Sequence, residues 1–188
     1  MIGRPVALSA ILALVPALAS AAPAAWTVDK ATSHLTFSSS VSGQAFTGSF
    51  QRWDAAIHFD PKDLAHSDVA ATIDIASAAT GNGDRDAEIP DQDWFWTSHF
   101  PRAIFVAHGF QPAGPGRYLA AGVLTVRSVA KPLTLPFSLA ITGTSAKMSA
   151  QVALNRLAFG IGQGEWQATD TVPAGVTVHI DLAAHRAP

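Results

Sequence analysis

The sequence predicts an all-β fold, an antiparallel sandwich or barrel of about eight strands. Three observations lead to this prediction. Apolar and polar residues alternate along several segments, and short turn-forming stretches separate these segments. The stretches that connect the alternating segments do not show apolar residues at helical spacing. In addition, charged residues make up only 14% of the chain, whereas helical bundles usually carry many Glu and Lys residues on their outer faces.

The alternating segments predict most of the strands in chain order. Every second residue tends to be apolar over 33–41, 69–75, 133–141, 148–154 and 175–182, which is the pattern of strands that bury one face. Clusters of Gly, Pro, Asp and Ser mark the turns between them, which we place at 58–63, 111–116, 141–147 and 160–165.

Two of the predicted strands are irregular. Over 45–59 the apolar set changes parity between Phe50 and Trp53, so we expect a bulge that bends one long strand, as a closed barrel requires. Pro132 and Pro136 cannot donate to a strand ladder. Their strand is therefore expected to lie at a rim or to have a break in its pairing.

One or two short helices are expected over 84–100. Asp84 can cap a first helix, and Asp86 and Glu88 suit the positive end of that helix. The stretch 90–100 could form a second helix, because Pro90 suits a first helical turn and Pro101 would end it.

The first residues predict a secretory signal peptide. Arg4 gives a basic start, and the apolar run over 6–19 has signal-peptide length but is too short to span a bilayer. Small residues up to Ala21 form an acceptable cleavage site. We therefore expect a signal peptide over 1–21 and a single domain over 22–188.

Composition argues against several classes of function. The chain has no cysteine, so a disulfide framework and thiol chemistry are excluded. A formal net charge of −2 gives no electrostatic reason to expect nucleic acid as a partner. A domain of this length can bury a core without disulfides.

Metal binding and catalysis find little support in the motifs. The acidic run over 82–88 resembles a calcium loop, but it contains Arg85 and has Ala87 where such a loop needs Gly, so we expect caps and ion pairs. The seven histidines form no HxH or HxxxH pair, and no serine lies in a G-x-S-x-G elbow. We predict no metal site, no catalytic residue and no cofactor.

The aromatic residues allow two interpretations. The chain has ten Phe and five Trp, with a dense group over 94–105. Small residues are expected to face them from the opposite wall, at Ala71, Ala120, Gly122 and Ala150. A barrel of about eight strands either fills with side chains or holds one small ligand, and the spacing of the residues leaves both outcomes open.

Five motifs in order resemble the YceI family of exported bacterial proteins. They are "WTVDKATSHLTF" (26–37), the hairpin over 46–81, "RDAEIPDQDWFWTSHFPRAIF" (85–105), "GVLTVRSVAKPLTLPF" (122–137) and "FGIGQGEW" (159–166). The resemblance covers about 26–184. It implies an elongated, lipocalin-like antiparallel barrel with an internal hydrophobic tunnel, located in the periplasm, that carries a polyisoprenoid or related amphiphilic lipid.

Two departures from the family pattern concern the most recognisable motif. The family commonly has Arg-Asp-x-His-Leu, whereas this chain has Glu88 in place of the His. The usual Phe-Phe-Asp becomes Trp94, Phe95 and Trp96. Both changes bear on recognition of the head group or on the width of the tunnel, so the identity of the ligand is not transferred.

The first hypothesis is therefore a periplasmic protein that sequesters and transports a polyisoprenoid, an isoprenoid quinone or a fatty-acid derivative without making bonds. Transient contact with a membrane or membrane protein would accompany transport. Arg85, Arg127 and Lys131 are the cations expected near a polar head group; a structural ion pair of Arg85 with Asp84 or Asp86 is the alternative. The predicted ligand-binding residues are Phe37, Phe46, Phe50, Trp53, Phe59, Arg85, Trp94, Phe95, Phe105, Arg127 and Phe137.

Two other classes of function stay open at this point. An accessory enzyme or redox partner would act on a bound quinone-like substrate, with Asp86 or Glu88 as a buried acid of raised pKa. A structural or stress-related barrel would have a filled core and no ligand.

Overall fold

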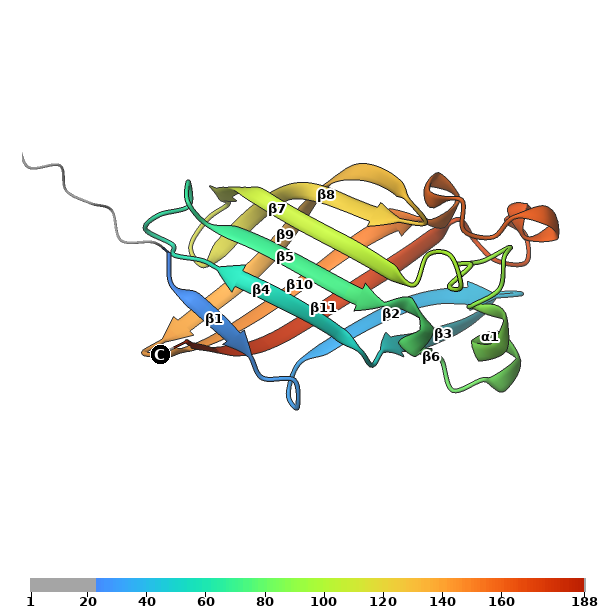
Figure 1. Cartoon of the computed structure of the whole chain (residues 1–188), viewed down its shortest axis with the longest axis horizontal. Helices are drawn as coiled ribbons and strands as arrows, with labels where there is room; N and C mark the ends of the chain where they lie inside the picture. Colours follow the sequence, from blue (N-terminus) through green and yellow to red (C-terminus); the bar gives the residue numbers. More distant parts are fainter. Residues whose placement is uncertain (1–22, 188) are drawn as a thin grey trace, which may run out of the picture.

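A closed β-barrel dominates residues 23–187, the part of the chain that this computed structural model describes (Figure 1). The alternating segments form its strands, with one face toward the lumen. The elements in chain order are β1 (Ala25–Val28), β2 (His34–Val41), β3 (Gln44–Phe50), β4 (Trp53–His58), β5 (Asp68–Asp74), η1 (Ile75–Ser77), β6 (Ala78–Ala79), α1 (Gly83–Glu88), β7 (Arg102–Pro112), β8 (Arg117–Val126), β9 (Val129–Thr142), β10 (Ser145–Asn155), η2 (Arg156–Phe159), η3 (Gly164–Gln167) and β11 (Gly175–Arg186).

The wall closes because β11 pairs with both β1 and β2. From β4 the antiparallel order runs through β5, β7, β8, β9 and β10 to β11. β1 and β2 together occupy one strand position of the wall, and β3 and β4 together occupy the neighbouring one. The barrel therefore has eight strand positions around its circumference. The predicted barrel of about eight strands is confirmed, and closure of the wall rules out the sandwich.

The bend predicted over 45–59 is a break between β3 and β4. The two linking residues turn toward η1, where the Gln51 N–H donates to the Ser77 carbonyl (3.2 Å) and the Arg52 N–H donates to Ser77 Oγ (2.9 Å). The pairing register of this strand with β1 and β2 therefore differs on the two sides of the break. The parity change in the sequence is the signature of this break.

The facing strand is broken at the same level, between β1 and β2. Ser33 is tied to β11, because its Oγ accepts a hydrogen bond from the Ala183 N–H (3.0 Å). The side chain of Lys30, which lies between β1 and β2, contacts the start of β4. Lys30 Nζ donates to the Trp53 carbonyl (2.7 Å), lies 3.0 Å from Asp54 Oδ1 and lies 3.7 Å from the centre of the Trp53 ring.

The prolines of β9 lie where its pairing on one side is interrupted, as predicted. β9 pairs with β8 from Val129 to Ser138, but its registered pairs with β10 begin only at Phe137. Pro132 and Pro136 fall in the stretch that is paired on the β8 side alone. The missing N–H groups account for this interruption.

Of the one or two short helices predicted over 84–100, one forms. α1 forms, although its N-cap is Asn82, whose Oδ1 accepts from the Arg85 N–H (2.9 Å), and not Asp84. The stretch 90–100 instead folds as consecutive turns. Trp96 adopts a left-handed backbone with φ of +48°, a conformation that ends a helix. Within residues 23–187, none of the helices has the length and apolar character needed to cross a membrane.

The barrel has two different ends (Figure 1). α1 lies at one end, together with the segment between β10 and β11; β1 and the C-terminus lie at the other. Hydrogen bonds connect the segment after α1 to the segment between β10 and β11: the N–H groups of Gly162 and Gln163 donate to the Asp93 carbonyl (2.8 and 2.7 Å). The two ends of the barrel are therefore covered by different segments.

Tight packing of β8 against β7 gives a first testable prediction. A Cβ on Gly122 would clash with the Val106 carbonyl oxygen and lie 2.9 Å from Ala107 Cβ. We expect Gly122→Ala to lower the free energy of unfolding by about 1–3 kcal/mol, measured by urea denaturation. Gly175→Ala is the matched control, because no atom counted there lies within 4 Å, and its effect should stay within about 0.5 kcal/mol. Equal effects would contradict the packing argument.

Candidate functional site: an apolar cavity inside the barrel

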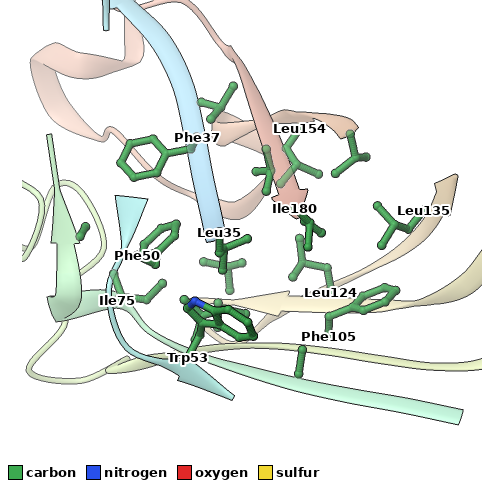
Figure 2. A pocket seen from close by; sticks show the side chains of 18 of the residues that line it. Leu35, Phe37, Phe50, Trp53, Ile75, Phe105, Leu124, Leu135, Leu154 and Ile180 are labelled. Carbon is green, nitrogen blue, oxygen red and sulfur yellow. The ribbon is translucent and has the colours of Figure 1, made fainter. Parts of the chain in front are cut away.

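The barrel encloses a cavity of about 570 Å³, a volume typical of small-molecule sites. Its wall is built almost entirely from apolar side chains, and nearly every strand contributes. Figure 2 shows labelled side chains from around the barrel pointing into the same space: Leu35, Phe37, Phe50, Trp53, Ile75, Phe105, Leu124, Leu135, Leu154 and Ile180.

Period-two alternation explains why these residues line one space. Successive side chains of a strand point to opposite faces, so the apolar set of each strand faces the lumen. Small residues leave that lumen open: Ala71 lines the cavity directly opposite Ala55 on β4 and Phe105 on β7. Ala120 also lines it. Ala150 packs against the core and Gly122 lies against the Phe105 ring, so both face inward as expected, although within the described chain neither is in the cavity lining.

The structure brings together ten of the eleven predicted ligand-binding residues. The cavity is lined by Phe37, Phe46, Phe50, Trp53, Phe59, Arg85, Trp94, Phe95, Phe105 and Phe137. The lining also includes aliphatic residues of β10 and β11, such as Val152 and Val178, which were not predicted because only aromatic and cationic residues were considered as ligand-binding candidates. The alternation of apolar and polar residues along these two strands could have identified them.

Arg127 is the exception. Its Nη1 donates to the backbone carbonyls of Trp94 and Gly160, so it fastens two segments at the α1 end and, among the described residues, is not in the cavity lining. The expectation that Arg127 meets a ligand head group is not supported by this geometry. Lys131 is exposed on β9 and does not line the cavity described here either.

Polar groups reach the cavity at the α1 end, which we call the mouth. Asp84, Arg85 and Glu88 of α1 line it, together with the N-cap residue Asn82. Asp84 is exposed, so the cavity meets the surface here. The Arg85 guanidinium lies 3.8 Å from the centre of the Phe46 ring, a cation–π contact. Within residues 23–187 no carboxylate lies in salt-bridge range of Arg85, so the predicted pair does not form a direct contact, although the Arg85 charge is a minor cause of the lowered pKa of Asp86.

The opposite end is closed by rings that we call the aromatic floor: Trp26, Phe59, Phe110, Tyr118 and Phe137. Phe59 lies 5.3–5.9 Å from three of the others, and Tyr118 stacks on Phe137 at 5.4 Å, measured between ring centres. Trp26 Nε1 donates to the Phe59 carbonyl (2.9 Å). Trp26 and Phe59 are only 6% and 5% exposed. The cavity is therefore polar and open at one end, and apolar and closed at the other.

A buried arginine at the α1 end is a lining residue that the sequence did not reveal. Arg156 is 3% exposed, and its guanidinium donates to backbone carbonyls between Ile161 and Pro173. Burial lowers the pKa of the Arg156 guanidinium, a cost that these hydrogen bonds offset. Because its partners are backbone carbonyls and not acidic side chains, no residue pattern in the sequence predicted that Arg156 would be buried.

Asp86 does not fit the role of a buried acid with a raised pKa. Its Oδ1 accepts hydrogen bonds from Thr80 Oγ1 (2.6 Å) and from the Thr80 N–H (2.8 Å). The hydrogen bond from the Thr80 hydroxyl is the main cause that lowers the pKa of the Asp86 carboxyl. The interaction ties α1 to the strand before it. Within the described residues, no three or more His, Asp or Glu side chains gather as a metal site.

The Asp86–Thr80 contact gives a prediction on pH dependence. Because the pKa of Asp86 is lowered in the folded protein, its stabilising effect is present above the ordinary Asp value and is lost as the pH falls through the lowered pKa. Asp86→Asn keeps an acceptor oxygen but removes the charge. We expect wild type to be more stable than Asp86→Asn near neutral pH, with the gap closing in strong acid, measured by urea midpoints. Asp84→Asn, on the exposed side of α1, is the control; a gap for Asp86→Asn that does not change with pH would contradict the assignment.

Comparisons with known proteins agree with this architecture. A family model described as a YceI-like domain matches residues 26–184. A "UPF0312 protein" of Pseudomonas savastanoi pv. phaseolicola is 31% identical over 132 residues, covering 67% of this chain and 69% of the relative.

Solved structures share the fold. BcnA of Burkholderia cenocepacia superposes with a TM-score of 0.80 at 30% identity, covering 84% of this chain and 99% of BcnA. A structure from Saccharophagus degradans, described as a polyisoprenoid binding domain implicated in plant cell wall breakdown, gives a TM-score of 0.69 at 16% identity, covering 87% of this chain and 99% of that domain. At 16% identity, the similarity to the Saccharophagus degradans domain shows a shared fold.

Proposed function

The chain belongs to the YceI-like family, and from that premise we propose that it binds the long apolar chain of an amphiphilic lipid, such as a polyisoprenoid, an isoprenoid quinone or a fatty-acid derivative. The observation that carries the proposal is the apolar cavity of about 570 Å³ within the barrel. The polyisoprenoid-binding description of a protein with the same fold supports it. Each methylene that leaves water for such a cavity contributes about 0.8 kcal/mol.

The polarity of the cavity gives the bound lipid a direction. Its polar head lies at the mouth, near Arg85 and Glu88, where hydrogen bonds and water are accessible. Its apolar chain runs toward the aromatic floor. The reverse orientation would bury a polar head among rings without partners, which costs free energy.

The protein acts by sequestering and transporting this lipid, without making or breaking bonds. The pKa of Asp86 is lowered, which is the opposite of what the enzymatic alternative needs from Asp86, the first of its two candidate acids. The open cavity speaks against a barrel with a filled core. The lipid is thus a cargo that the protein takes from one membrane or protein partner and releases to another.

The site of action in this proposal is the periplasm. The basis is the signal-peptide pattern over 1–21, which lies outside the described residues. Cell fractionation and N-terminal sequencing test it. A periplasmic protein that begins at Ala22 is the expected result, and a cytoplasmic protein that begins at Met1 would overturn it.

Displacement of a fluorescent polyene fatty acid tests the binding function. Farnesol, geranylgeraniol and longer prenols should displace the probe in a saturable way with one chain per protein. Glycerol and short alcohols should not, because they bury little apolar surface. Failure of both the probe and the prenols to bind would overturn the proposed function.

A further inference from the structure

We propose that the aromatic floor sets the length of the chain that the cavity accepts, with Phe137 as the residue that determines this specificity. The inference rests on the function proposed above. It concerns the closed end of the cavity, where a chain that enters from the mouth must stop.

The first argument is that the floor is a built barrier. Phe137 faces the cavity, and its ring centre lies 5.9 Å from that of Phe59, 6.3 Å from that of Phe110 and 5.4 Å from that of Tyr118. Edge-to-face and stacked rings at these separations attract one another. Tyr118 pairs directly with Phe137 across β8 and β9 and stacks on its ring, and among the described residues it is not in the cavity lining. Leu139, two residues closer to the end of β9, still lines the cavity, so the Phe137 ring narrows the lumen at the level of the floor.

The second argument is that the floor is held from outside. The loop after β4 covers this end, and it is fixed by Ser67, a fully buried residue whose Oγ donates to the Asp63 carbonyl (2.8 Å) and accepts from the Asp60 N–H (3.1 Å). Leu64 of the same loop packs against the floor. A chain end that reaches the level of Phe137 thus meets a packed surface that the loop supports from outside.

The third argument concerns the head group. A lipid longer than the cavity must push its head out of the mouth, away from Arg85 and Glu88, and leave its extra carbons in water. Affinity should therefore rise with chain length until the tail reaches the floor, and then stop rising. Each two carbons that gain burial strengthen binding by roughly tenfold, so this break-point is measurable.

The test is the break-point in affinity across geraniol, farnesol, geranylgeraniol and longer prenols. Phe137→Ala opens space between Phe59, Phe110 and Tyr118 and should move the break-point to a longer prenol. Ala184→Leu adds bulk at the same end, where Ala184 lines the cavity, and should move it to a shorter one. Phe137→Leu is a milder opening if Phe137→Ala folds poorly, which circular dichroism will show.

Phe46→Ala is the matched control, because it removes the same ring at the mouth. It should weaken binding across the series without moving the break-point. The inference is overturned if the Phe137 and Ala184 variants also leave the break-point in place, or if wild type shows no break-point. If no prenol binds, the proposed function fails first. If prenols bind but the break-point does not respond to the floor, only this inference fails.

Discussion

Replacing Arg156 with Met is expected to lower the free energy of unfolding by about 3–5 kcal/mol, the largest effect on stability that we predict. Its guanidinium gathers carbonyls from a loop that otherwise lacks regular pairing. Nε donates to Pro173 O (3.0 Å), and Nη2 donates to Trp166 O (2.6 Å) and Val172 O (2.8 Å). Without these donors, buried carbonyls are left unsatisfied, and the loop at the α1 end loses its main tie.

Urea denaturation measures this effect, and two further variants make it specific. Arg156→Lys keeps the charge but not the planar fork of donors, so it should recover only part of the lost stability. Arg117→Met removes an exposed arginine whose side chain makes no hydrogen bond, ion pair or ring contact within residues 23–187, and it should change stability by less than about 0.5 kcal/mol. An Arg156→Met variant as stable as Arg117→Met would show that the buried network adds nothing.

Filling the cavity is expected to have the largest effect on binding. Ala71→Trp places a large ring in the lumen between Ala55 and Phe105, where the lipid chain is proposed to lie. Displacing about four buried methylenes costs about 3 kcal/mol, or roughly a 100-fold loss of affinity for a prenol. Displacement of the fluorescent fatty acid measures it.

The neighbouring residue on the same strand supplies the control. Ala70 is exposed on the outer face of β5, one residue from Ala71. Ala70→Trp adds the same ring to the outside of the wall and should bind prenols like wild type. If Ala71→Trp binds as tightly as Ala70→Trp, while both unfold at the wild-type midpoint, the ligand does not occupy the lumen.

Much of this architecture was predictable because alternation is a local signal. Leu133, Leu135 and Phe137 follow one another on one face of their strand, and the structure places all three in the cavity lining. Whether such a face surrounds a cavity or a filled core was not predictable from period two, because it depends on barrel width and on side chains from distant strands. Ala55, Ala71 and Phe105 meet only when three strands pair.

The errors share a different physical cause, which is long-range backbone contact. Arg127 adopts a left-handed backbone with φ of +49° in the turn between β8 and β9, and its side chain meets carbonyls of Trp94 and Gly160. Those partners lie far away in sequence and have no side-chain signature. Arg156 was missed for a related reason: its partners lie within 17 residues along the chain, but they too are backbone carbonyls without a side-chain signature.

The most direct test of the central claim is mass spectrometry of the organic extract of wild-type protein purified from its natural host without detergent or denaturant. The account predicts an amphiphile with one long apolar chain, in an amount close to that of the protein, and much less of it from Ala71→Trp than from Ala70→Trp. An extract of wild type free of such lipid, together with failure of the empty protein to take up prenols or fatty acids, would contradict the account.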